Sequence, residues 1–216
     1  MKRLIQFPAW ILTGLTLLVS CERQEGLPKL QVCSSKYVYY NTGDSKVYLR
    51  QSLTEIWIVF AQEEITKEEA ELILSKYTFL GMTGLASSYK QVGVRINENV
   101  TDCTIVNNYL SVLNEDEAIF SATPVFYYSA TDPNSYFILL SEVLTKNNES
   151  LISESDFIDY AESMNLELVE AKYATQYFRV KEVKTGFEAL EIANQIYESG
   201  KVEYAQPNGI VKVEPH

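Results

Sequence analysis

AIFSATPVF (residues 118–126) and VEYAQPNGIV (residues 202–211) are the two stretches that decide the fold. Each reads as a mainly apolar strand that is interrupted by a proline, and each proline has an alanine two places before it. Pro124 and Pro207 are 83 residues apart. Because proline cannot donate a ladder hydrogen bond, we expect both strands to lie at a sheet edge or to leave the sheet at the proline.

Outward from these two strands, the chain repeats one order of elements at an offset of 83 to 84 residues. An apolar strand at 56–61 corresponds to one at 136–140. A second strand at 92–96 corresponds to one at 177–180. The sequence therefore predicts two similar halves, with a chance similarity between two stretches rich in strands and helices as the alternative.

A helix follows the first strand of each half. In the first half, Thr66 and Glu69 have the spacing of a capping box ahead of an apolar helical pattern. In the second half, Ser153 or Ser155 takes the position of the cap. A further helix with apolar periodicity precedes each closing strand, so every half reads as alternating strands and helices.

Ahead of the repeat, KYVYY (36–40), the turn formers NTGD (41–44) and KVYL (46–49) predict a β-hairpin. Short helices alternating with amphipathic strands favour helices on one face of a mainly antiparallel sheet. We therefore expect an α+β fold of two tandem ferredoxin-like (split βαβ) units, preceded by this N-terminal hairpin. The two halves should superpose with Arg95 near Arg179.

The first 21 residues predict a secretory signal. Lys2 and Arg3 precede an apolar run at 4–18, which is too short to cross about 30 Å of hydrocarbon comfortably. The run ends in LVSC (18–21), which resembles the lipobox of bacterial lipoproteins. The resemblance implies that Cys21 carries the lipid anchor. A signal without lipid attachment is the alternative.

These observations divide the chain into four segments. They are a signal peptide at 1–20, a lipidated tether at 21–35, a first α+β unit with the hairpin at 36–130, and a second α+β unit at 131–216. The turn formers SATDPN (129–134) mark the boundary between the units. We expect a protein of the cell envelope, held by its lipid in the outer membrane because Glu22 stands where an inner-membrane retention signal has aspartate.

The amino-acid composition limits the classes of partner that this protein can bind. The net charge of -11 argues against nucleic acid, because its phosphates would be repelled. A hydrophobic content of 46%, with 15 Tyr and 9 Phe, predicts real cores and broad, half-buried sheet faces. Cys33 and Cys103 either form a disulfide, which an oxidising compartment allows, or remain buried thiols.

Residues for catalysis are scarce in this sequence. The only histidine is His216, the last residue, so a Ser-His-Asp or Cys-His arrangement is hard to build. Neither a glycine-rich phosphate loop nor a four-ligand metal set is found, and we expect no cofactor and no metal. Carboxylate pairs such as Glu63 with Glu64, or Glu115 with Glu117, leave glycoside hydrolysis as the enzymatic alternative. We expect a protein that is not an enzyme.

The last third of the chain carries the most specific motif. GFEALEIANQIYESG (186–200), followed by VEYAQPN (202–208), resembles the end of the N-terminal prodomain of secreted subtilisin-like proteases from Bacteroidetes. Two earlier pieces are similar to other parts of that prodomain, namely the aromatic hairpin at 37–49 and TPVF at 123–126. The resemblance covers most of residues 36–212, and the catalytic domain of the family does not follow it here.

The resemblance implies a role in templating the folding of a subtilisin-like protease, or in blocking its active site. A strand that leaves the last helix can add to a protease cleft through main-chain hydrogen bonds. The residues expected to bind the partner are Pro207, Asn208, Gly209, Ile210 and Val211. The alternatives are an ordinary edge strand at these residues, and a structural or interaction lipoprotein of the cell surface with no protease link.

Overall fold

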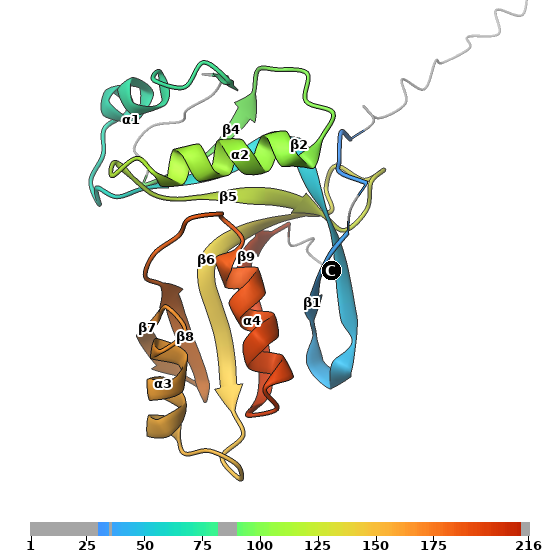
Figure 1. Ribbon diagram of the computed structural model, residues 1–216, viewed down its shortest axis with the longest axis vertical. Coiled ribbons are helices and arrows are strands. Elements are labelled where there is room, and N and C mark those ends of the chain that lie inside the picture. The colour runs from blue at the N-terminus through green and yellow to red at the C-terminus, as the bar shows by residue number, and fades with distance from the viewer. Residues whose placement is uncertain (1–29, 35, 82–89, 213–216) are drawn as a thin grey trace, which may run out of the picture.

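The computed structural model describes residues 30–34, 36–81 and 90–212. The expected signal peptide, Cys21 and most of the tether lie outside the described residues, and so does His216. The described residues form four α-helices and nine strands that join in one sheet (Figure 1). The chain is therefore an α+β protein, as its sequence predicts.

The strands alternate with the helices along the chain. The strands are β1 (Tyr37–Tyr40), β2 (Lys46–Phe60), β3 (Leu80–Gly81), β4 (Gln91–Ile96), β5 (Ile119–Tyr127), β6 (Tyr136–Asn147), β7 (Leu166–Lys172), β8 (Thr175–Val180) and β9 (Val202–Val211). The helices are α1 (Lys67–Leu74), α2 (Cys103–Asn114), α3 (Glu154–Glu162) and α4 (Glu188–Glu198). A single turn of 3₁₀ helix, Thr42–Asp44, joins β1 to β2.

The two halves have the same strand order. It is β3-β4-β2-β5 in the first half and β7-β8-β6-β9 in the second, and every pairing is antiparallel. This order is compatible with the expected split βαβ units. The halves do not form separate sheets, because β5 pairs with β6 at Val125–Tyr127 and makes the sheet continuous.

Pro124 and Pro207 occupy equivalent places in the two halves. Pro124 pairs with Ile56 and Pro207 with Val143, in each case directly beside a shift in strand register. The pairing of β5 with β6 begins only at Val125, one residue after Pro124, while β9 is an edge strand that pairs with β6 alone among the described strands. Both prolines therefore lie where a missing N–H breaks no ladder bond.

The arginines of the repeat are also equivalent. Arg95 in β4 lies opposite Glu55 in β2, and Arg179 in β8 lies opposite Glu142 in β6. Glu55 immediately precedes Ile56, the residue paired with Pro124, and Glu142 likewise precedes Val143. Each half therefore places one glutamate and one arginine side by side at the same point of its sheet.

One sequence correspondence was wrong. The strand at 56–61 matches the second part of β6, from Val143 onward, and not the run at 136–140. The second part of β6 reads as less apolar because its buried positions include Thr145 and Asn147. Both are hydrogen-bonded to the buried Gln176 of β8, at 3.1 and 2.8 Å. Buried polar side chains that satisfy one another conceal a core strand from an analysis of hydrophobicity.

Two strands, β3 and β7, have no counterpart among the sequence predictions. β3 is only two residues long, and β7 is mostly exposed, so neither has the apolar alternation of a half-buried strand. Both are edge strands held by a single neighbour, β4 and β8 respectively. Pairing in the folded sheet, and not local preference, determines their conformation.

The predicted helix starts are confirmed. The Thr66 hydroxyl accepts a hydrogen bond from the backbone N–H of Glu69 at 3.2 Å, and the Glu69 carboxylate accepts one from the N–H of Thr66 at 2.8 Å. In the second half, Ser153 is the cap and accepts from the N–H of Asp156. These reciprocal contacts satisfy donors that the first turn of a helix leaves without partners.

The N-terminal hairpin forms with Tyr40 opposite Lys46, as predicted, but it packs on the second half. The ring of Tyr40 stacks on Tyr197 of α4 with centroids 4.6 Å apart, and the side-chain amide of Asn194 donates to the carbonyl of Val38 at 2.8 Å. Tyr37 stacks on Phe187, directly before α4, at 5.1 Å. The hairpin thus crosses from the first half to brace the second.

Cys33 and Cys103 form a disulfide, which settles the question that the sequence left open. It ties the segment before the hairpin to the first residue of α2. Cys33 is also held at the sheet, where its N–H donates to the carbonyl of Gln51 at 2.8 Å. The bridge closes a loop with a sequence separation of 70 residues.

Candidate functional site

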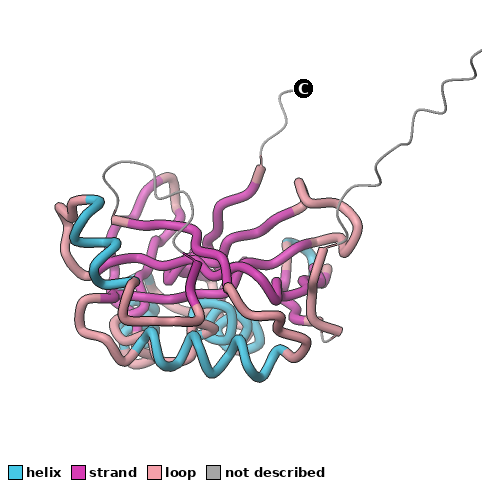
Figure 2. The backbone as a smooth tube through the Cα atoms, turned by 90° about the horizontal axis from the view of Figure 1, so that it is seen from above, coloured by secondary structure: helices cyan, strands magenta, loops and turns pink. Residues whose placement is uncertain are grey.

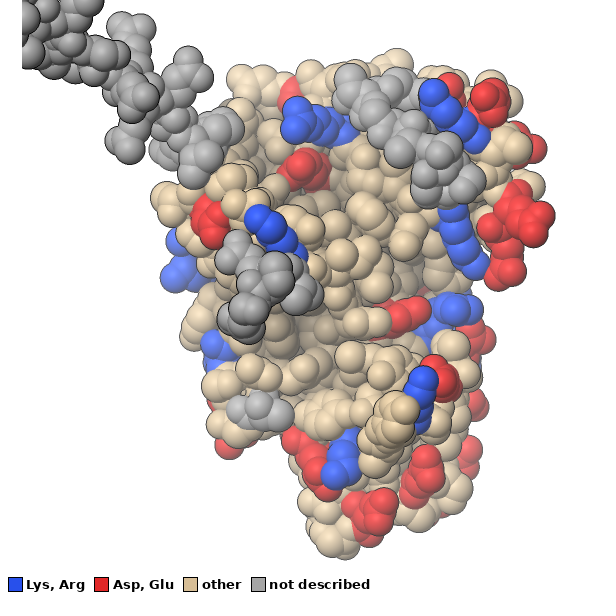
Figure 3. Space-filling model, turned by 180° about the vertical axis from the view of Figure 1, so that it is seen from behind, with Lys and Arg blue, Asp and Glu red and all other residues tan. Residues whose placement is uncertain are grey.

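Among the described elements, no helix covers one face of the sheet. Helices α2, α3 and α4 lie on the other face (Figures 1 and 2). The strands alternate accordingly: Ile56, Ile58 and Phe60 of β2 are fully buried, while Trp57 and Val59 between them are partly exposed. Figure 3 shows this side of the molecule, with a broad uncharged area through its middle and charged side chains mostly toward its rim.

Partly exposed apolar side chains from three strands define this helix-free face. They are Trp57, Val59, Ile138, Leu140, Leu144 and Ile210. A continuous apolar area at the surface of a small protein marks a site of interaction more often than it marks a neutral surface. The face is therefore the first candidate for function.

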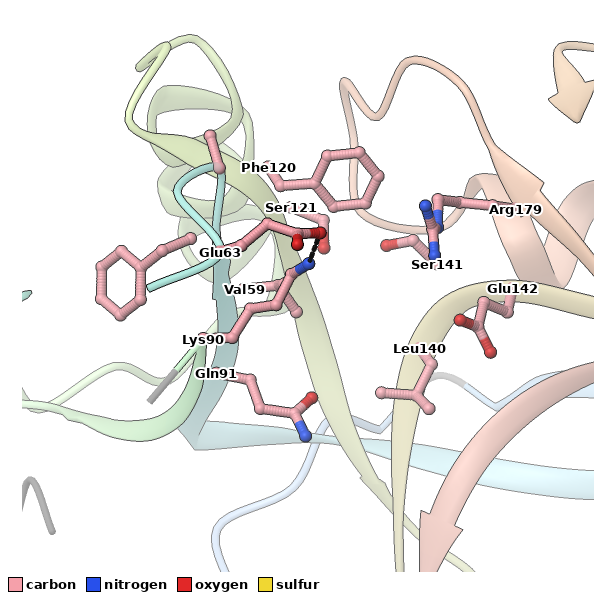
Figure 4. Close-up of a pocket in the computed structure, with 12 residues that line it drawn as sticks. Val59, Glu63, Lys90, Gln91, Phe120, Ser121, Leu140, Ser141, Glu142 and Arg179 are labelled. Carbon is pink, nitrogen blue, oxygen red and sulfur yellow. Dashed lines mark hydrogen bonds and ion pairs between the residues drawn. The ribbon is translucent and has the colours of Figure 1, made fainter. Parts of the chain in front are cut away.

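A cavity of about 390 Å³ opens beside this face, and we call it the first cavity. It lies in the wedge where β5 and β6 diverge after their short pairing, so both halves of the chain contribute to its wall (Figure 4). The polar and aromatic side chains around it are Glu63, Lys90, Phe120, Ser121, Ser141 and Arg179.

The two serines of the first cavity are unusual. Ser121 is fully buried and Ser141 is 7% exposed, and neither hydroxyl has a hydrogen-bond partner. In Figure 4 both side chains face the space between β5 and β6. A buried hydroxyl without a partner costs about 1–3 kcal/mol, so two of them at one cavity indicate positions prepared for another group.

Arg179 lies beside the serines with much of its hydrogen-bonding capacity free. No ion pair joins it to Glu142, although these two described residues are opposite each other in the sheet. The Glu142 carboxylate instead accepts from the side-chain amide of Asn208 at 2.8 Å. The guanidinium lies 6.0 Å from the centre of the Phe120 ring, and its contact with Glu167 is long, at 3.7 Å.

Glu63 and Lys90 form an ion pair at the rim of the same cavity, with 2.8 Å between Oε1 and Nζ (Figure 4). The hydrogen bond from Lys90 is the main cause that lowers the pKa of the Glu63 carboxyl. Both side chains are exposed, so the pair adds little to stability. Its effect is to balance two charges next to the serines.

A second cavity, of about 300 Å³, lies beside the glutamate and arginine of the first half, and Tyr136 and Ile138 of β6 also line it. It is lined by Glu55 and Arg95, the counterparts of Glu142 and Arg179, together with Trp57 and Tyr127. The Tyr127 hydroxyl donates to the Glu55 carboxylate, and burial together with this bond raises the pKa of Tyr127. The indole N–H of Trp57 is buried without a partner.

The five residues expected to bind a partner lie in β9. Pro207 is opposite Val143, Gly209 opposite Leu139, and Val211 opposite Phe137. This segment is therefore already paired with β6 up to Val211, and it is not a free tail. Only residues 213–216 lie beyond the described chain. The role of these five residues in binding stays a prediction, and the edge-strand alternative describes their conformation.

The two carboxylate pairs that the sequence offers for glycoside hydrolysis lie on different elements. Glu63 and Glu64 follow β2, while Glu115 and Glu117 follow α2, and all four are exposed. In the part of the chain that the structure describes, no three His, Cys, Asp or Glu residues gather as metal ligands. A search of the same residues finds no helix long and apolar enough to cross a membrane.

Comparison with protein-family models, with curated proteins and with solved structures gives no match for this chain. The site must therefore be interpreted from its own geometry. Sequence reasoning missed Ser121, Ser141 and Arg179. The available signal was a serine within each of two mainly apolar runs, IFSAT (119–123) and LLSEV (139–143).

Proposed function

We propose that the protein is a non-enzymatic binding module of the cell envelope, and that it presents the helix-free face of its sheet to a protein partner. The observation that carries this proposal is the row of partly exposed apolar side chains on that face, defined above. Such a surface is costly to leave in water and becomes favourable when a partner covers it.

The partner that the sequence favours is a subtilisin-like serine protease, through the resemblance of residues 186–208 to a protease prodomain. The conformation of β9 changes the mechanism by which inhibition would occur. Because Gly209–Val211 already pair with β6 along one edge, a protease cleft that pairs with both edges of a bound strand would require those residues to leave their own sheet. Docking through the helix-free face needs no such rearrangement.

We expect the full chain to inhibit at least one member of a panel of subtilisin-like proteases, and Leu140→Asp to weaken this inhibition by about tenfold or more. A charge at the centre of an apolar interface loses the burial of one leucine side chain and must itself be desolvated. Leu72→Asp is the matched control, because Leu72 is 70% exposed on α1, on a different element. The measurement is the inhibition constant of each purified variant.

Three other outcomes are informative. Equal inhibition by the Leu140 and Leu72 variants would exclude the helix-free face as the contact. If removal of residues 213–216 abolishes inhibition while Leu140→Asp still inhibits, the end of the chain and not the helix-free face makes the contact with the protease. If no protease in the panel is bound or inhibited, the protein is better described as an interaction lipoprotein without a protease link.

Attachment through Cys21 is a separate part of the proposal, supported by the LVSC motif behind a basic and apolar leader. We expect Cys21→Ala to abolish lipid attachment, so that the protein is recovered in the soluble fraction or keeps its leader. Mass spectrometry and fractionation measure both. A Cys21→Ala protein that stays in the membrane with the mass of processed, lipidated protein would contradict this assignment.

A further inference from the structure

The two serine hydroxyls of the first cavity require a partner that the described chain does not provide. Ser121 comes from β5 and Ser141 from β6, so the two hydroxyls approach one space from different halves of the molecule. A hydroxyl can donate one hydrogen bond and accept others. A group that accepts from both would remove the cost of burying them.

Arg179 adds a third donor at the same place. Its planar guanidinium carries five N–H donors in a fork that matches a carboxylate in two-point contact. The only ion pair of Arg179 within the described residues is the 3.7 Å contact with Glu167, which is long for a charge-assisted hydrogen bond. The ring of Phe120 supports the other side of the guanidinium.

We propose that the first cavity binds a carboxylate group, held by the hydroxyls of Ser121 and Ser141 and by the guanidinium of Arg179. A volume of about 390 Å³ leaves room for a small molecule or for the end of a peptide behind that group. The apolar part of such a ligand would lie against Leu140 and Phe120, which also line the cavity.

The charge around the cavity favours a single negative charge over a phosphate. Lys90 is neutralised by Glu63 at 2.8 Å and Glu142 lies next to Ser141, while Arg179, whose ion pair with Glu167 is 3.7 Å long, is the less tightly paired of the two cations in the lining. The chain as a whole has a net charge of -11. A doubly charged phosphate would meet these carboxylates with only this one loosely paired cation to offset the repulsion.

Two sources can supply the group, and paired probes distinguish them. The first pair is N-acetylglycine and its neutral amide, added to the full chain. The second pair is a short peptide with a free C-terminal carboxylate and the same peptide with an amidated end. Binding is measured by NMR as shifts of the backbone amide signals of Gln91, Ser121 and Ser141 during titration.

We expect the carboxylate of at least one pair to shift these signals, and its amide to shift them far less. Each hydrogen bond to the charged carboxylate adds to the binding free energy. Loss of these bonds in Arg179→Gln, or in the double variant Ser121→Ala with Ser141→Ala, should therefore weaken binding by about tenfold or more. Arg95→Gln is the matched control, because Arg95 is the counterpart of Arg179 in the first half. It should leave the affinity unchanged.

A response to both carboxylates identifies a small-molecule site, and a response to the peptide alone identifies the chain end of a protein partner. The proposal is overturned if neither carboxylate shifts the signals, if carboxylate and amide bind equally, or if the double serine variant binds like the natural chain. Thermal unfolding shows whether the double serine variant is folded. Its unfolding temperature should not fall, because the two hydroxyls that it lacks have no hydrogen-bond partner in the natural chain. None of these outcomes depends on whether a protease binds the helix-free face.

Discussion

Removal of the Cys33–Cys103 disulfide is expected to lower the free energy of unfolding by about 4 kcal/mol. The bridge closes a loop with a sequence separation of 70 residues, and chain-entropy arithmetic for a loop of that size gives a stabilisation of this order, through restriction of the unfolded chain. Without the bridge, the segment before the hairpin is held to β2 by few contacts, among them the backbone bonds of Cys33 and Leu53.

The measurement is denaturant-induced unfolding of the full chain with and without a reducing agent. The double variant Cys33→Ser with Cys103→Ser should unfold at the midpoint of the reduced natural chain, and a reducing agent should not change it further. If reduction leaves the midpoint of the natural chain unaltered, the bridge either does not form or does not stabilise the fold.

Gly186→Ala is expected to destabilise the protein by about 3 kcal/mol. Gly186 has a φ of +84°, which costs an L residue about 1–2 kcal/mol. In addition, a Cβ at this position would lie 2.4 Å from the carbonyl oxygen of Ala122 in β5. Backbone atoms cannot rotate away, so the contact forces a shift with a further cost of about 1–3 kcal/mol.

Gly200→Ala is the matched control for this experiment. Gly200 has a φ of +71° but nothing within 4 Å of its added Cβ, so we expect a loss of only about 1 kcal/mol. The difference between the two variants isolates the contact between the segment before α4 and the first half. Equal destabilisation in both variants would show that Gly186 does not pack against Ala122 as described.

Several local features could be predicted from the sequence because their causes are local. The hairpin at its N-terminus follows from aromatic strands around turn formers, and the starts of α1 and α3 follow from the caps Thr66 and Ser153. The prolines at 124 and 207 predicted breaks in pairing, because the missing N–H is a property of the residue itself. The α+β class follows from the alternation of apolar strands with amphipathic helices along the chain.

The site was less accessible to sequence analysis. Ser121 and Ser141 are separated in the chain and look like isolated polar residues in apolar strands, and their lack of partners becomes evident only when β5 and β6 are placed side by side. Arg179 reads as one half of a cross-strand pair with Glu142, yet Asn208 binds that glutamate. Competition between neighbours in space decides which of these groups bind each other.

The sequence by itself determined the α+β class, the repeat with equivalent prolines and arginines, the N-terminal hairpin and the helix caps. Only the tertiary structure decided that the two halves share one sheet, that the hairpin packs on α4, that Cys33 pairs with Cys103, and that residues 207–211 lie in β9 and not in a free tail. The reason is physical. Caps, turns and prolines act through neighbouring atoms of the same segment, whereas edge pairing, the wedge between β5 and β6 and its unpartnered hydroxyls depend on contacts between residues far apart in the chain.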